Sequence, residues 1–227
     1  MDWLNREALA NLLLRITPAL FEWAMMLLPL TLYLIWLGFE VGRKKKPYLV
    51  PGAWDTLLLI LALSGLLFLG PLTWVISHFA EYGILAYGVA YAVYLIIVAI
   101  LCFGWIVSRR QSLVVYNIDP NAFQLTFMPI LDNAGVPYQM TPGHIAFAEQ
   151  QLLIDLEPMP RLFCVTISWV GDQALWACLE SALRPALAEI HTTRNPAGAI
   201  LPLYASLLLC FISMSTVLFV WYIAFIF

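Results

Sequence analysis

Three residues in one polar stretch are the best candidates for acid–base chemistry. Asp155 and Glu157 stand two residues apart in a segment with the pattern of a strand, so both side chains point to one side of it, and His144 precedes them. Two carboxylates near an imidazole could transfer protons to a lipid substrate at a membrane surface. An exposed polar strand face explains the same residues, and both interpretations stay open.

The other reactive residue types form no recognisable motif. The three histidines fall in different segments, and no two of the four cysteines form a Cys-x-x-Cys pair; these residues are His78, His144, His191, Cys102, Cys164, Cys178 and Cys210. The chain has no His-Glu-x-x-His, no Gly-x-Ser-x-Gly and no glycine-rich phosphate loop. Free cysteine usually behaves as a small buried hydrophobe. We therefore expect no metal, no cofactor and no enzymatic activity.

The composition predicts an integral membrane protein. Of the 227 residues, 63% are hydrophobic and 11% are charged, whereas soluble domains hold about 25% charged residues. The net charge of −3 gives no reason to expect nucleic acid as a partner, because binding to phosphates depends on Lys and Arg. The expected partner of the apolar segments is the lipid bilayer.

Apolar runs long enough to cross about 30 Å of hydrocarbon divide the chain. Residues 1–16 have the pattern of an amphipathic helix that lies on the membrane surface or against other protein. Thr17-Pro18 is expected to start a new helix, and residues 17–108 are expected to hold three transmembrane helices. The predicted spans are residues 18–39, 55–79, 84–107 and 199–227.

Two basic clusters predict the orientation. They follow the first and third spans and consist of Arg43, Lys44, Lys45 and Lys46, and of Arg109 and Arg110. Since basic residues beside spans stay cytoplasmic, both clusters place the two termini outside and residues 109–198 in the cytoplasm. We expect a bacterial inner (plasma) membrane. The first cluster is expected to face anionic headgroups and to touch the acidic cytoplasmic domain.

The spans contain few residues that could bind a ligand. Tyr87, Tyr91 and Tyr94 are spaced four and three apart and share one face of the third span. This ladder could contact a quinone or a pigment, or it could pack between helices with its hydroxyls bonded to a neighbouring span. Glu22 lies one turn inside the first span, where it is either functional or reaches interfacial water. Gly65 permits close contact between helices.

Residues 109–198 have the pattern of a small α+β domain. Strands are expected at 113–116, 136–140, 144–148, 152–156 and 162–169, and helices at 119–133 and 172–190. Runs of strands closed by helices favour an antiparallel sheet with the helices on one face. The predicted fold class is an integral membrane α-helical protein of four transmembrane helices. A small α+β domain, an antiparallel sheet with two helices, is inserted between the third and fourth spans.

The absence of a catalytic motif favours a non-enzymatic membrane subunit or scaffold. Its cytoplasmic domain is expected to bind other membrane-protein subunits or a second copy of itself. One alternative is an oligomeric channel or small-solute transporter, with a path along the tyrosine ladder or the Gly70-Pro71 bend. The other alternative is a membrane-interface lipid enzyme that uses His144, Asp155 and Glu157.

Overall fold

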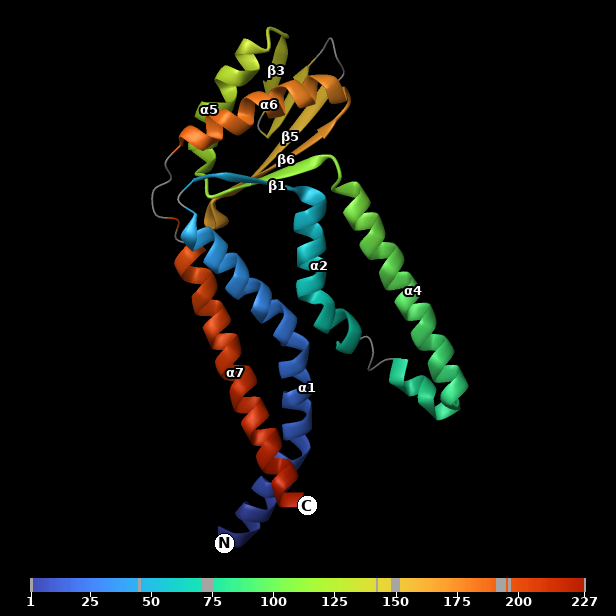
Figure 1. The fold of residues 1–227 in the computed structure, drawn as a ribbon. Coiled ribbons are helices and arrows are strands. Elements are labelled where there is room, and N and C mark those ends of the chain that lie inside the picture. Colours follow the sequence, from blue (N-terminus) through green and yellow to red (C-terminus); the bar gives the residue numbers. More distant parts are fainter. Residues whose placement is uncertain are drawn as a thin grey trace. The chain divides into compact units, whose positions relative to one another are not determined.

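The computed structural model divides the chain into two compact units (Figure 1). We call them the membrane unit (Met1–Ile35, Leu59–Leu101 and Pro202–Phe227) and the sheet unit (Trp36–Leu58 and Cys102–Leu201). The structure describes residues 2–44, 46–70, 76–141, 143–147, 152–190, 195 and 197–226, and for residues 2–15, 78, 225 and 226 it describes the backbone alone.

Four of the described helices are long and apolar enough to cross a membrane, as expected for a multi-pass membrane protein. They are α1 (Asp2–Arg43), α2 (Gly52–Leu69), α4 (Ile84–Ser108) and α7 (Ala197–Ile226), and a short helix η1 (His78–Tyr82) precedes α4. The candidate span within α1 is Ile16–Arg43.

Two predicted helix boundaries were wrong. The chain does not restart at Thr17-Pro18, because α1 continues through Pro18 and Pro29; an apolar helix tolerates proline where its neighbours satisfy the freed carbonyl groups. The second helix begins at Gly52 and ends at Leu69 instead of continuing to residue 79. Pro71, which lies outside the described residues, disfavours helical backbone at Gly70.

Close contacts hold the helices of the membrane unit together. A Cβ added at Gly65 of α2 would overlap the carbonyl oxygen of Met26 in α1, so the expected close helix contact at Gly65 is confirmed. The rings of Phe21 in α1 and Phe219 in α7 stack with centroids 4.1 Å apart. Small and flat side chains therefore let these helices approach, as is common between helices in lipid.

The sheet unit contains a six-stranded antiparallel sheet with the strand order β1-β2-β6-β5-β4-β3. The strands are β1 (Tyr48–Pro51), β2 (Ser112–Tyr116), β3 (Tyr138–Thr141), β4 (His144–Phe147), β5 (Leu152–Met159) and β6 (Cys164–Val170). Two helices, α5 (Pro120–Asn133) and α6 (Gln173–Glu189), complete the α+β fold, with η2 (Pro160–Leu162) between β5 and β6.

The domain is more than an insertion between the third and fourth spans, because β1 comes from the connector between α1 and α2. Tyr48 pairs with Tyr116 and Pro51 with Leu113, so this connector forms an edge strand of the sheet. The backbone of this connector is extended over Tyr48–Pro51. Its pairing with β2 is a long-range contact that no local pattern indicates. Proline suits this edge position, where one backbone N–H has no strand to bond.

Strand β5 is longer than predicted and passes through Pro158. The N–H of Leu156 donates to the carbonyl of Gly143 on the β4 side, and the N of Pro158 points the same way, since alternate residues share a direction. The pairing of β4 with β5 ends at Asp155. Pro158 therefore interrupts no hydrogen bond, and the chain turns only at Pro160, where η2 begins.

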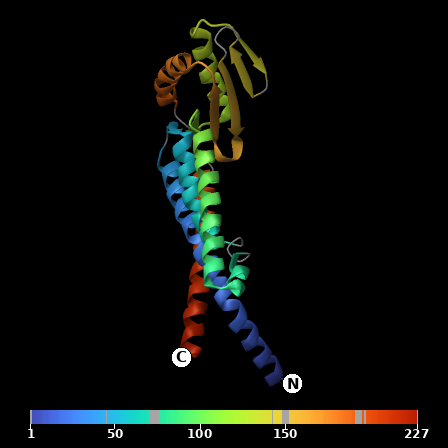
Figure 2. The same cartoon turned by 90° about the vertical axis from the view of Figure 1, so that its right-hand side faces the viewer.

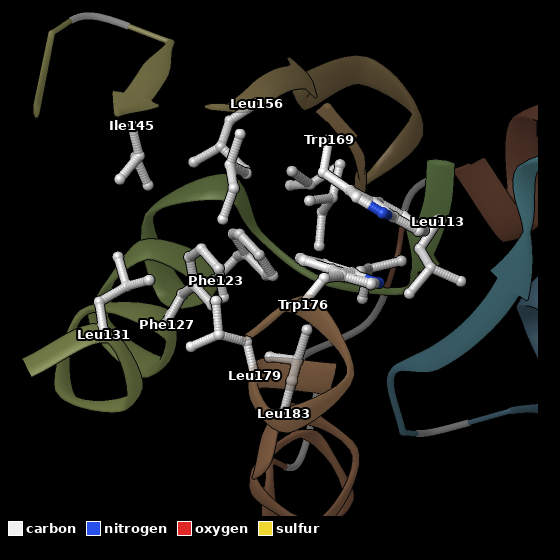
Figure 3. Packing of buried hydrophobic residues seen from close by; sticks show 14 of the residues in the cluster. Leu113, Phe123, Phe127, Leu131, Ile145, Leu156, Trp169, Trp176, Leu179 and Leu183 are labelled. Atoms are coloured by element: carbon white, nitrogen blue, oxygen red, sulfur yellow. The ribbon is translucent and has the colours of Figure 1, made fainter. Parts of the chain in front are cut away.

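The core of the sheet unit lies between the sheet and the two helices, both of which cover one face (Figure 3). Alternate strand residues such as Val115, Ile154 and Ile167 are fully buried against them, as predicted for an antiparallel sheet with helices on one face. The rings of Trp169 in β6 and Trp176 in α6 stack with centroids 4.1 Å apart. The carboxylates of Asp119 and Asp172 cap the two helices.

Truncation of a core residue should destabilise the domain. Leu183→Ala removes a side chain that is 0% exposed, and the lost contacts plus the cavity should cost about 2–5 kcal/mol. The matched change Leu125→Ala on α5, where the side chain is 77% exposed, should cost less than about 0.5 kcal/mol. Denaturant unfolding followed by near-ultraviolet circular dichroism measures both, and equal effects would contradict this packing.

Candidate functional site

The face of the sheet opposite α5 and α6, which we call the open face, carries the predicted acid–base residues. Three rows of neighbouring side chains cross its strands: His144, Asp155, Ser168 and Ser112; then Glu157, Thr166, Val114 and Val50; then Met159, Cys164, Tyr116 and Tyr48. The rows follow from the alternation of side chains along each strand. All of these residues belong to the sheet unit.

The structure brings His144 and Asp155 into direct contact. Nδ1 of His144 lies 2.5 Å from Oδ1 of Asp155, with 59% and 40% of the two side chains exposed. Glu157 lies on the same side of β5, one row away, and 3.9 Å from a guanidinium nitrogen of Arg109. The three residues therefore face one way; the spacing predicted this for Asp155 and Glu157, and the pairing of β4 with β5 adds His144. Solvent screens exposed pairs of this kind.

The His144–Asp155 pair lies on an exposed strand surface. A small cavity of about 50 Å³ lies instead on the other face, between α5 and the sheet, lined by residues that include Phe123, Leu156 and Val165. A lipid enzyme would need a pocket that holds its substrate beside the acid–base pair. The pair is therefore assembled on an open surface, and the enzyme hypothesis stays untested.

A second polar contact on the open face was not predicted. Asp55 lies in the first turn of α2 and is half-buried; its Oδ1 accepts a hydrogen bond of 2.6 Å from the Tyr116 hydroxyl. A Cβ added at Gly52 would overlap the Ser112 side chain, and the Ser112 hydroxyl donates to the Arg109 carbonyl at 2.8 Å. The start of α2 thus lies directly on β2. The one sequence signal was an acidic residue at the start of an apolar helix.

The thiol of Cys164 sits under this contact and is inert. Cys164 is buried, and burial together with the nearby charge of Asp55 raises the pKa of its thiol from an ordinary 9.0 to about 11. Only the thiolate attacks electrophiles or binds metals well. Among the described residues, no three His, Cys, Asp or Glu side chains lie close enough together to hold a metal ion.

Asn117 joins three segments of the sheet unit. Its side chain is fully buried, and its amide nitrogen donates to the carbonyls of Val41, at 3.1 Å, and Lys44, at 2.7 Å, at the end of α1. Its side-chain oxygen accepts a 2.6 Å hydrogen bond from Asn195. Asn195 in turn accepts from the Ala197 N–H and caps α7. One buried amide therefore links the end of α1, the end of β2 and the start of α7.

A close backbone approach accompanies this network. A Cβ added at Gly198 would lie 3.0 Å from Cα of Gly42, so α1 and α7 approach closely where both enter the sheet unit. Asn117 has φ of 62°, a left-handed conformation that asparagine adopts more readily than most residues. Sequence reasoning missed this site, because the signal is a single Asn between a strand and a helix cap.

The basic clusters make different contacts. Lys44, which directly follows α1, forms an ion pair of 2.8 Å with Glu40 of that helix, and its Nζ lies 4.1 Å from the ring centroid of Tyr48. Among the described ion pairs, Arg109 of the second basic cluster pairs with Glu157, a carboxylate of the predicted domain. The first cluster does touch the predicted domain, because the Lys44 carbonyl accepts a hydrogen bond from Asn117. The Lys44 ammonium packs on Tyr48 of β1 and pairs with no carboxylate of that domain in the described chain. Lys45 lies outside the described residues, and Arg110 is exposed.

The tyrosines of α4 lie on one face, as predicted; Tyr87 and Tyr91 stack, and Tyr94 is tilted against Tyr91. Ring centroids are 6.1 Å apart for Tyr87 and Tyr91 and 6.2 Å apart for Tyr91 and Tyr94. The Tyr94 hydroxyl donates to the carbonyl of Leu67 in α2, which is the expected bond to a neighbouring span. The side chain of Glu22 is exposed, and its role stays a prediction. His191 and the side chain of His78 lie outside the description.

No protein family, characterised protein or solved structure matches this chain. The class defined by its fold is a multi-pass membrane protein that carries an antiparallel α+β domain.

The raised pKa predicts that Cys164 resists alkylation. At pH 8 a thiol of pKa about 11 holds about one part in a thousand of thiolate. Iodoacetamide should therefore label the exposed Cys178 of α6 in the folded protein and should label Cys164 only after unfolding. Folding favours the neutral thiol of Cys164. Its contribution to the stability of the folded protein is therefore complete below pH about 9 and is lost as the pH rises through about 11. Mass spectrometry of tryptic peptides measures the labelling; rapid native labelling of Cys164 would contradict the buried position.

Removal of the Asn117 side chain should loosen both helix ends. Asn117→Gly keeps the left-handed backbone without strain but loses three hydrogen bonds of about 1 kcal/mol each, for a total of about 2–3 kcal/mol. Amide hydrogen exchange should increase in residues 41–46 and at Ala197, measured by mass spectrometry of the full chain. The exposed control Asn133→Gly should leave exchange at both places unchanged. Unchanged exchange in Asn117→Gly would refute the linking role.

Proposed function

We propose that this protein is a non-enzymatic subunit of a membrane complex, and that it associates with a second copy of itself. The supporting observation is the surface of α4. This 25-residue helix has no buried residue and a mean hydropathy of 2.5 over its most apolar stretch. Within the described chain, therefore, one complete span offers its whole length to lipid or to another polypeptide.

Small residues distinguish one side of α4 from a purely lipid-facing helix. Gly88, Ala92 and Ala99 lie on one face at spacings of four and seven, and all three are exposed. A Cβ added at Gly88 would meet nothing within 4 Å, whereas one added at Gly65 of α2 would overlap α1. Glycine that lies against lipid contributes little packing, but it lets a partner helix approach closely. The face of Gly88, Ala92 and Ala99 suits a second α4.

The orientation proposed from the basic clusters agrees with the pairing of β1 with β2. The two strands follow the two clusters and form one ladder, so both connections belong on one side of a membrane that four spans cross. Basic residues on short connections favour the cytoplasmic side. The sheet unit is then cytoplasmic and both termini are outside. A cytoplasmic sheet on each copy would be brought together by α4.

The channel and lipid-enzyme alternatives have weaker support. The hydroxyl of Tyr94 is bonded to α2, which favours packing over a path for solutes. The His144–Asp155 pair stands exposed. We therefore rank both alternatives behind the membrane subunit.

Bulky residues on the small face of α4 should weaken self-association. Gly88→Leu and Ala92→Leu prevent close approach and should raise the dissociation constant at least tenfold, or about 1.4 kcal/mol. Val93→Leu is the matched control, because Val93 is 50% exposed and lies on another face of α4. Energy transfer between labelled copies in vesicles, measured over a range of protein-to-lipid ratios, gives the constants. A wild-type chain that is monomeric at every ratio would refute the proposal.

A further inference from the structure

The turn between β5 and β6 has a composition suited to a membrane surface. Met159, Arg161 and Leu162 are all exposed, with 43% exposure for Met159 and 42% for Leu162. Figure 2 shows this turn at the end of the sheet away from β3 and β4. Two exposed apolar side chains around a cation form a pattern that inserts shallowly among lipid headgroups.

Contacts within the sheet unit place this turn beside the ends of two spans. The N–H of Ile118 donates to the carbonyl of Phe163, next to the turn. The neighbouring Asn117 binds the carbonyls of Val41 and Lys44 at the end of α1 and Asn195 before the start of α7. A span that ends at Arg43 and one that begins at Ala197 must leave the hydrocarbon near these residues. The turn therefore lies near the membrane interface.

Basic residues of α1 and its connector add to this surface. Met159 is in the same cross-strand row as Tyr48, three strand spacings away, or about 14 Å. The ammonium of Lys44 lies on the Tyr48 ring and pairs with Glu40. Arg43, Lys46 and Arg161 are exposed, and none of the three forms an ion pair within the described chain. Free cations near an interface attract anionic headgroups.

We propose that the turn Met159–Leu162 and the basic residues Arg43, Lys46 and Arg161 form a binding surface for anionic lipid headgroups. The apolar side chains of Met159 and Leu162 enter the interface, and the three cations bind lipid phosphates. This docks the β5–β6 end of the sheet on the membrane. The inference extends the proposed function and does not depend on self-association, because one copy of the chain supplies every residue.

A fluorescent label at residue 162 tests this surface in the full chain. Leu162→Cys is labelled after Cys102, Cys178 and Cys210 are replaced by alanine; Cys164 remains, since its buried thiol does not react. The protein is reconstituted in bilayers of phosphatidylcholine, with or without phosphatidylglycerol, that contain lipids with nitroxide at the headgroup. Leu125→Cys on α5 is the matched control, because Leu125 is an exposed leucine on the helix-covered side of the domain.

We expect strong quenching at residue 162 and weak quenching at residue 125. The quenching at residue 162 should increase when phosphatidylglycerol is present. Arg161→Gln should reduce the ratio of docked to undocked turn about fivefold, as expected for the loss of one cation near an anionic surface. If Leu162→Cys fails to fold, Met159→Cys provides the same measurement. Equal quenching at residues 162 and 125 would overturn the proposal. A turn that is covered by a protein instead of lipid would give that result. Quenching that does not respond to phosphatidylglycerol or to Arg161→Gln would overturn the recognition of anionic headgroups.

Discussion

The buried amide of Asn117 is the constraint on which the rest of the sheet unit depends. The last carbonyls of a helix have no partner inside it, and burial without one costs about 1–3 kcal/mol per group. Asn117 satisfies carbonyls of Val41 and Lys44 at the end of α1, and through Asn195 it also fixes the cap of α7. The first and last spans therefore enter the domain at one point. Their positions there are set by hydrogen bonds that few other side chains could replace.

The connections between spans and sheet are short and structured. β1 ends at Pro51 and α2 begins at Gly52, and three residues separate α4 from β2. The Tyr116 hydroxyl holds Asp55 of α2, and the Arg109 guanidinium lies beside Glu157 of β5. A displacement of α2 or α4 would thus act directly on β2, the strand between β1 and β6. The start of α2 and the end of α4 are therefore both fixed to the sheet within the sheet unit.

The two faces of the sheet serve different purposes. One face buries Ile154, Ile167 and their neighbours under α5 and α6 and stabilises the domain. The other is polar and holds the contacts with α2 and Arg109 near β2, while the His144–Asp155 pair and Met159 remain exposed farther along. Buried and exposed residues alternate along β4 and β5. Successive residues of these strands therefore belong in turn to the core and to the opposite face. The candidate lipid-binding turn lies where the open face meets the span ends.

The sequence by itself determined the local features of this protein. Long apolar runs indicated four spans, Asp119-Pro120 and Asp172 marked the starts of the two domain helices, and alternation in 152–156 placed Asp155 and Glu157 on one side of a strand. These features depend on periodicity and on caps a few residues away. Only the tertiary structure decided that 48–51 is a strand of the sheet, that α1 continues through Pro18, and that Asn117 links two span ends. The strand pairing and the Asn117 hydrogen bonds need partners that are distant in the sequence. The continuation of α1 through Pro18 needs neighbouring groups that offset the helix-breaking preference of proline. Local propensity contains no information about such partners or neighbours.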